Sequence, residues 1–299
     1  MRHITLADGR RWHVVSAHDA ALEAAAHERQ QAYFGGDTRI ALRPGDVVLD
    51  VGANVGAFAR MAAEAVGCSG RVVCYEPVPA AAEALALNAA ALAAADAAAG
   101  PGRRRRAPIQ TVCAALGASD GFAHVTFFPR CAALSTLFRD DEDALRATYS
   151  LLRHGGAGLP RPLAALAAAA AAAAPGLFWA VQRRIGGALL LRGAAELPCR
   201  VLATSTALAA ALPPGGRLAL LKINVERAEA DVLLGVSAAD WRRIDAVAAQ
   251  VHDAHGRAAW AAALLTRAGG FDDVRVAREP RFADCSLVMV YATRLGRRQ

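Results

Sequence analysis

The stretch at residues 46–66 constrains the fold more than any other part of the chain. An apolar run at 46–51 follows a Pro-Gly turn, and a helical pattern occupies 58–66. Between them, residues 50–56 read Asp-Val-Gly-Ala-Asn-Val-Gly. A buried strand that leads through a glycine loop into a helix predicts the first unit of a doubly wound α/β domain.

The alternation of strands and helices continues on both sides of an interruption in the middle of the chain. Further strands are predicted at residues 71–76, 109–115, 123–128, 218–223 and 244–251, and further helices at 80–99, 230–234 and 258–268. Segments 271–276 and 286–291 predict a closing antiparallel pair. We therefore expect a doubly wound, mostly parallel sheet of the Rossmann-like type, with helices on both faces.

Two segments lie outside this pattern. Residues 1–43 predict an extension made of a hairpin over 4–15, turning at Asp8-Gly9, and a helix over 19–33. The domain proper, at 44–299, carries an insert at about 138–197 that opens with a charged helix at 140–152.

The part of the insert at 163–182 is uncharged and nearly all alanine, with Pro175-Gly176 inside it. Its length raises the question of a membrane span. Alanine is only marginally apolar and the Pro-Gly pair would break the helix, so we expect no span. The insert is either a helical lid over the site or a low-complexity segment that is partly mobile.

The net charge of +7 is compatible with nucleic acid, an acidic carrier protein or a membrane surface as partner. The arginine run 103–106 has no aromatic residues interleaved with it, which favours a solvated loop over a nucleic-acid site. The six cysteines show neither a C-x-x-C pair nor zinc spacing, and no apolar signal core occupies the N-terminus. These features predict a reduced, cytoplasmic protein.

The loop at residues 50–56 does not fit a nicotinamide cofactor. Such a site has the spacing G-x-G-x-x-G, whereas this chain has G-x-N-x-G. S-adenosylmethionine (SAM) carries an ammonium, a carboxylate, a sulfonium and a ribose, but no phosphate. Asp50 suits its cationic amino-acid part, Gly52 permits a tight turn and close approach, and Asn54 can donate or accept. Gly56 permits close packing where the helix starts.

A second acid ends the next strand. Glu76 lies about 20 residues after Gly56, where a carboxylate usually binds a ribose diol, and Pro77 then stops the strand. A strand-end acid can also simply cap the next helix. Together with the loop, it predicts a SAM site formed by Asp50, Gly52, Ala53, Asn54, Gly56, Glu76 and Pro77.

Two strand ends offer residues for catalysis. Period-two alternation brings Lys222, Asn224 and Glu226 to one face, as in a lined pocket, although a charge-paired strand end would look the same. The next strand ends in His252-Asp253, and His252 can titrate near neutral pH. It is either a general base or a histidine that only binds its neighbours.

These motifs together resemble the FkbM family of SAM-dependent methyltransferases. The resemblance covers residues 45–292, with the insert matching poorly, and rests on five segments: 48–56, 75–79, 221–226, 250–253 and 287–292. The first two are shared by many class I methyltransferases. The lysine strand and its spacing to His252-Asp253 are more specific.

The chain departs from the wider family at two positions, with Asn224 in place of an aspartate and Arg227 in place of a glycine. This form resembles the branch associated with polyketide and nonribosomal peptide pathways. The resemblance implies O-methylation of a hydroxyl on a small natural product or a carrier-bound intermediate. A neutral amide is a poor ligand for a hard cation, so no metal is expected.

We expect the enzyme to position the acceptor and remove its hydroxyl proton. His252 is the first candidate for the base, and Asp253 or Glu226 the second; Lys222 belongs to the same predicted catalytic set.

Two other functions remain open. An RNA methyltransferase would fit the charge, but residues 224–227 have no aromatic beside them to stack a flipped base. A noncatalytic SAM-binding pathway protein is the other alternative, because the insert looks degenerate. No nucleic-acid partner is expected.

Overall fold

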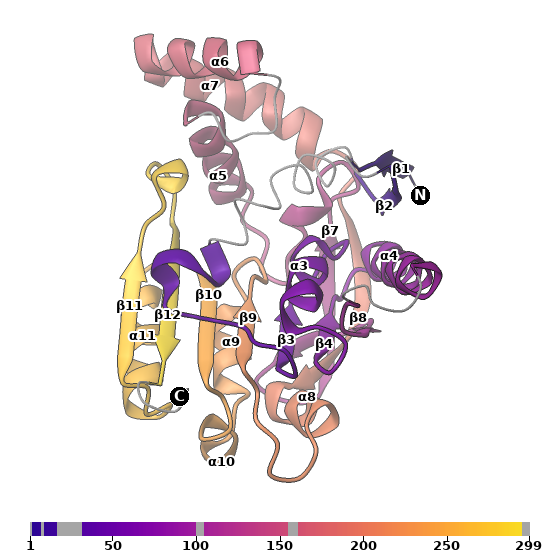
Figure 1. Cartoon of the computed structure of the whole chain (residues 1–299). Helices are drawn as coiled ribbons and strands as arrows, with labels where there is room; N and C mark the ends of the chain where they lie inside the picture. The colour runs from indigo at the N-terminus through magenta and orange to yellow at the C-terminus, as the bar shows by residue number, and fades with distance from the viewer. Residues whose placement is uncertain (1, 7–8, 17–31, 100–104, 155–160, 295–299) are drawn as a thin grey trace.

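A computed structural model of the chain describes residues 2–6, 9–16, 32–99, 105–154 and 161–294. Its centre is a seven-stranded sheet in the order β11-β12-β10-β9-β3-β4-β5 (Figure 1). All neighbours in it are parallel except that β12 runs antiparallel to β10 and β11. The strands are β3 (Val47–Val51), β4 (Arg71–Tyr75), β5 (Ile109–Val112), β9 (Leu220–Ile223), β10 (Ala246–His252), β11 (Asp273–Ala277) and β12 (Leu287–Thr293).

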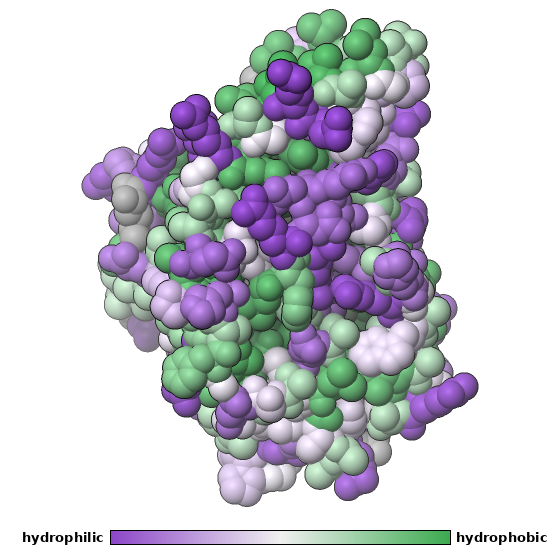
Figure 2. All heavy atoms as spheres, turned by 180° about the vertical axis from the view of Figure 1, so that it is seen from behind, coloured by the Kyte–Doolittle hydropathy of each residue, from purple (hydrophilic) through white to green (hydrophobic). Residues whose placement is uncertain are grey.

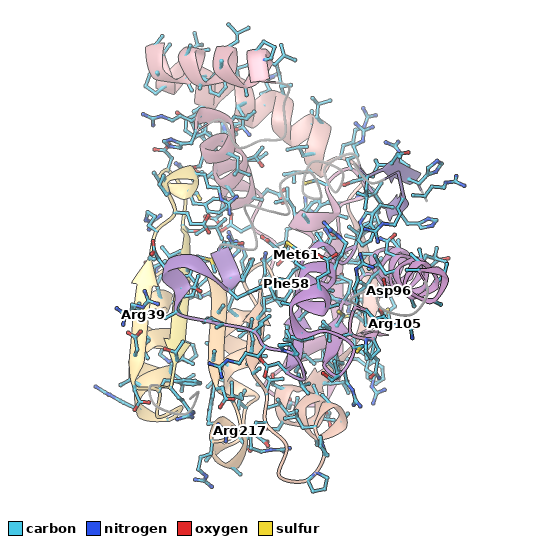
Figure 3. The ribbon with its side chains drawn as sticks, in the orientation of Figure 1. Arg39, Phe58, Met61, Asp96, Arg105 and Arg217 are labelled. Carbon is cyan, nitrogen blue, oxygen red and sulfur yellow. The ribbon has the colours of Figure 1, made fainter. Side chains whose placement is uncertain are left out.

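Helices cover both faces of this sheet. One face packs against α3 (Ala57–Val66) and part of α4 (Pro79–Ala98). Phe58 and Met61 of α3 point toward the sheet (Figure 3). The other face packs against α8 (Thr204–Ala211), α9 (Glu229–Leu234), α10 (Ala238–Trp241) and α11 (Arg257–Arg267). The central strands are mostly apolar, as strands covered by helices on both faces usually are. The predicted doubly wound α/β fold is confirmed.

A second, three-stranded sheet has the order β6-β8-β7. It consists of β6 (Ala115–Gly117), β7 (Gly121–Phe127) and β8 (Ala195–Ala203). The single strand predicted over 109–115 is wrong: the amide of Ala114 turns back to the carbonyl of Val112, and Ala115 starts a strand of the other sheet. The sequence pattern also misses β8, which contains Pro198, because pairing with strands on both sides overrides its weak strand propensity.

The insert connects β7 to β8. It forms α5 (Asp141–Arg153), α6 (Arg161–Ala173) and α7 (Pro175–Gly186), followed by a π-helical turn at Gly187–Leu191. These helices project beyond the carboxyl edge of the sheet (Figure 1). The break expected at Pro175 is confirmed: α6 ends before it and the proline starts α7, where its fixed φ suits a first turn.

The N-terminal hairpin is confirmed as β1 (Arg2–Thr5) paired antiparallel with β2 (Arg11–Val14). Asn88 of α4 holds it in place, since its side-chain amide bonds both the N–H and the C=O of His13. Of the helix predicted over 19–33, residues 17–31 lie outside the described part; residues 32–33 are helical.

By length and composition alone, α4 is the one helix among the described residues that could cross a membrane. Its hydropathy comes largely from alanine, and a core helix can meet the same criteria. Leu85 and Leu92 of α4 are buried against the rest of the fold.

Candidate active site

Two glycines of the loop between β3 and α3 are required by packing. Gly52 has a φ of 76°, and a Cβ there would lie 1.7 Å from the backbone oxygen of Asn224, just past β9. Gly56 has a φ of 94°, and its Cβ would lie 2.4 Å from Leu85 of α4. A side chain at either position would force these elements apart.

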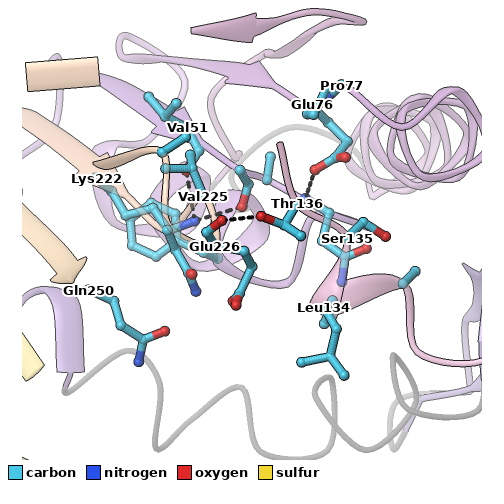
Figure 4. A pocket seen from close by; sticks show the side chains of 18 of the residues that line it. Val51, Glu76, Pro77, Leu134, Ser135, Thr136, Lys222, Val225, Glu226 and Gln250 are labelled. Carbon is cyan, nitrogen blue, oxygen red and sulfur yellow. Dashed lines mark hydrogen bonds between the residues drawn. The ribbon is translucent and has the colours of Figure 1, made fainter. Parts of the chain in front are cut away.

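This loop forms one wall of a cleft at the carboxyl edge of the sheet, beneath the insert (Figure 4). The empty volume, including the part open to solvent, is about 1390 Å³. Of the predicted SAM-binding set, the residues that line it are Gly52, Ala53, Asn54, Glu76 and Pro77. Gly56 lies behind the lining.

Glu76 is nearly buried at the end of β4. Its Oε2 accepts a hydrogen bond from the backbone N–H of Asn54 at 2.8 Å, and its Oε1 accepts one from the backbone N–H of Val78 at 3.0 Å. Burial raises the pKa of Glu76 to about 7, against the two amides, which hold it lower. Each oxygen keeps a lone pair for a further donor, so Glu76 fits a ribose diol at this edge of the cleft.

Asp50 does not line the cleft. The predicted contact of Asp50 with the amino-acid part of the cofactor is therefore wrong. It is fully buried and faces Lys222 in the β3–β9 register, with 2.7 Å between its Oδ1 and the ammonium. Burial raises the pKa of Asp50, and the Lys222 charge opposes that rise. The same ammonium donates to the backbone oxygen of Gly52 at 2.9 Å. Asp50 thus holds the loop through Lys222.

Lys222 also lies 5.5 Å from the ring centres of Tyr33 and Phe58, a cation–π arrangement. Tyr33 in turn accepts a hydrogen bond from the amide of Asn224 at 3.1 Å. Lys222, Asn224 and Glu226 all line the cleft, which is the arrangement predicted from their alternation (Figure 4). Only Lys222 lies within β9, which ends at Ile223.

His252, at the end of β10, faces two carboxylates closely and a third, that of Asp143, at 3.8 Å from its Nε2. Its Nδ1 lies 3.0 Å from Glu229 Oε1, and its Nε2 lies 3.3 Å from Glu226 Oε2. Burial alone would lower the pKa of His252, but the hydrogen bonds and charges of Glu226 and Glu229 raise it to about 10. The imidazole is therefore protonated at neutral pH and has no lone pair to accept a proton.

His252 is also absent from the cleft lining. These two observations argue against its predicted role as the general base and leave it as a cation that orients Glu226. Asp253 does not line the cleft either. Its Oδ1 accepts from the amide of Ala258 at 3.0 Å, in the first turn of α11, as a helix cap does.

Arg227 connects the active-site loop to the insert. Its guanidinium pairs with Asp140 at 3.1 Å and with Asp143 at 2.5 Å, both at the start of α5. The hydroxyl of Thr136 donates to the backbone oxygen of Glu226. The loop after β9 and the insert therefore form one wall around the cleft.

Sequence reasoning missed several polar side chains of the cleft. Tyr33 precedes the first strand of the sheet, Gln250 lies inside β10, and the others belong to the insert or the loop before it. No periodic pattern marks these positions. The missed residues are Tyr33, Ser135, Thr136, Thr148 and Gln250.

The strand order, the single antiparallel strand, the glycine loop and the acid at the end of β4 define a class I methyltransferase. No family model matches the chain. In sequence it is 32% identical, over 256 residues, to the 31-O-demethyl-FK506 methyltransferase FkbM of Streptomyces tacrolimicus, covering 85% of this chain and 83% of that protein. The chain belongs to the FkbM family of SAM-dependent methyltransferases.

Similar solved structures include an FkbM methyltransferase from Methylobacillus flagellatus KT, with 11% identity and a TM-score of 0.46 over 90% of this chain and 50% of that one. Another is Aeropyrum pernix fibrillarin with bound SAM, with 12% identity and a TM-score of 0.42 over 97% and 93%. Similarity this low is no basis for assigning an acceptor.

Proposed function

We propose that this methyltransferase acts on oxygen, and that its acceptor is a hydroxyl of a small natural product, free or bound to a carrier protein. The name of the Streptomyces tacrolimicus relative describes a methyltransferase for an O-demethylated product. That name supports an oxygen acceptor for this chain as well.

The cofactor would bind at the glycine-loop end of the cleft. Glu76 would accept the ribose hydroxyls, while Gly52 and Asn54 would border the methionine part. SAM supplies an electrophilic methyl group on a sulfonium. The protein then has to orient the acceptor oxygen in line with that group and exclude water.

The observation that carries the proposal is the position of Glu226. Its carboxylate lines the cleft together with the glycine loop, and the His252 imidazolium behind it fixes its orientation. We assign Glu226 as the base. It takes the hydroxyl proton while the oxygen–carbon bond forms and the carbon–sulfur bond breaks, which leaves a neutral thioether as the leaving group.

The part of the cleft beneath the insert suits a largely apolar acceptor. Two hydroxyls, of Ser135 and Thr148, are placed among apolar side chains. Pockets of this kind bind apolar molecules and orient them through a few polar groups. The apolar side chains are Leu134, Leu137, Ala147, Leu151, Phe282 and Leu287.

The test is transfer of labelled methyl from SAM to a panel of hydroxylated apolar natural products, the same compounds as carrier-protein thioesters, and RNA. We expect label in an ether group of a small molecule. Glu226→Gln should lower kcat about 10²–10⁴-fold and leave the Kd for SAM unchanged. Glu83→Gln, at an exposed position of α4, is the matched control.

Label in RNA alone would replace the proposal with nucleic-acid methylation. Tight SAM binding with no transfer to any acceptor would indicate a noncatalytic protein. An unchanged kcat in Glu226→Gln would remove Glu226 as the base.

A further inference from the structure

The two alanine-rich helices of the insert expose large apolar side chains. Leu166 of α6 is 66% exposed and Leu177 of α7 is 69% exposed. Figure 2 shows apolar residues gathered over this protruding end of the molecule. We call the following set the outer apolar face: Leu163, Leu166, Leu177, Val181, Ile185 and Leu189, each about half exposed or more.

The arrangement along α7 is amphipathic. Leu177, Val181 and Ile185 recur every four residues and therefore lie along one side of the helix. Another side carries Phe178 and Trp179, whose rings contact Tyr149 of α5 at 5.9 and 5.5 Å. The contacts with α5 account for the packing of α7 and leave the outer apolar face uncovered.

The charged side chains of α6, α7 and the π-helical turn after them are all basic. No acidic residue occurs in the sequence between Asp143 and Glu196. Arg183, Arg184 and Arg192 are exposed, and within the described part of the chain none of them takes part in an ion pair. Three arginines beside exposed leucines complement an anionic partner.

The shape favours a deformable partner over a folded one. The outer apolar face lies on a protruding helix pair, and none of its residues lines the active-site cleft. A folded partner anchors its side chains in matching hollows. A lipid surface needs none, because an amphipathic helix with basic flanks buries its apolar side between the headgroups.

We propose that the outer apolar face binds the surface of a membrane that contains anionic lipids. The helices lie on the bilayer and do not cross it, since α6 and α7 are separate helices that are too short to span. The inference is independent of the acceptor and of the assignment of Glu226.

The experiment is flotation of the full-length protein with phosphatidylcholine vesicles, and with phosphatidylcholine vesicles that also contain phosphatidylglycerol. We expect at least about tenfold tighter binding to the anionic vesicles, weakening as salt is added. Leu177→Gln/Ile185→Gln and Arg183→Glu/Arg184→Glu should each weaken binding by about tenfold or more. Unchanged thermal unfolding would show that the variants fold.

Matched controls change the same residue types elsewhere. Leu87→Gln/Phe122→Gln alters exposed apolar side chains of α4 and β7, and Arg242→Glu/Arg267→Glu makes the same change in net charge. Both should bind like the unmodified protein.

Three outcomes would overturn the proposal. The first is no binding to either kind of vesicle. The second is binding that the test variants and their controls reduce equally. The third is a concentration-dependent dimer that Leu177→Gln/Ile185→Gln dissociates, without vesicle binding, which would make the face an interface between two copies.

Discussion

The guanidinium of Arg227 lies 2.5 Å from the carboxylate of Asp143, and this ion pair ties the loop that carries Glu226 to the first turn of α5. Arg227 adopts a φ of 82° and Glu226 a φ of 48°, a conformation that favours glycine. Such strain costs about 1–3 kcal/mol per residue and persists only where surrounding contacts enforce it. Here the contacts come from the start of α5 in the insert and from Glu229 and Arg257, which bond the backbone of Arg227.

Breaking this pair should loosen the cover of the cleft. Arg227→Gly relieves the backbone strain but removes both contacts to α5, so we expect the KM for the acceptor to rise by about tenfold while the Kd for SAM changes little. Asp143→Ala should have a smaller effect in the same direction, because Asp140 still pairs with Arg227. The double variant should be no worse than Arg227→Gly alone, as steady-state kinetics and calorimetry would show. Additive losses would mean that the two residues act separately.

The protonation of His252 should make stability depend on pH. Its pKa of about 10 in the folded protein lies above the ordinary value near 6.5. The stabilisation is fully present below pH 6.5 and is lost as the pH rises through about 10, with a slope of up to ~1.4 kcal/mol per pH unit between those values. Urea denaturation from pH 6 to 10 would measure it. His252→Gln should flatten that slope, and a parallel curve would contradict the assignment.

Glu76 should make SAM binding sensitive to pH. Its pKa of about 7 leaves part of the carboxyl protonated at neutral pH, and ribose hydroxyls donate to the ionised form. We therefore expect the Kd for SAM to rise as the pH falls below 7, by up to about tenfold per pH unit. Calorimetric titration from pH 5.5 to 8.5 would test this. Glu76→Gln should bind more weakly and lose the dependence; if the slope survives, another group is responsible.

The buried pair of Lys222 and Asp50 should matter for folding more than for chemistry. Lys222→Met leaves the Asp50 carboxylate in the core without its cation, which should cost about 3–5 kcal/mol in the free energy of unfolding. Lys222→Met/Asp50→Asn should recover a large part of this loss, because no unpaired charge remains. Denaturant unfolding of the two variants would measure both free energies of unfolding and so test this prediction. A double variant as unstable as the single one would show that the pair is not the cause.

The fold could be predicted from the sequence where one element constrains the next. The strand β3 is buried on both faces, so its apolar run, the glycine loop after it and the helix α3 can all be predicted. The break between β5 and β6 cannot be predicted in this way, because a single turn at Ala114 directs the chain into another sheet. The strand β8 forms because it pairs with a strand on each side, and local strand propensity does not reflect such pairing.

The sequence predicts which positions form the candidate site, but it does not predict which of their side chains contact one another. Sequence placed His252 and Glu226 at neighbouring strand ends, but their contact, and that of His252 with Glu229, depends on how three segments meet. From the sequence alone, the ordinary pKa of a histidine therefore favours His252 as the general base. In the same way, the sequence predicts Asp50 as a ligand for the cofactor, whereas the register between β3 and β9 places Lys222 opposite it.

The close approach of Gly52 to the backbone of Asn224 joins the loop that would border the cofactor to the strand end that leads to Glu226. The glycine loop and the strand end that leads to the proposed base therefore pack directly against each other. Four of the six apolar side chains beneath the insert, Leu134, Leu137, Ala147 and Leu151, belong to a separate excursion of the chain between β7 and β8. Changes in that excursion would therefore alter the acceptor end of the cleft first, and those that keep Asp140 and Asp143 would preserve the ion pairs that hold the loop of Glu226.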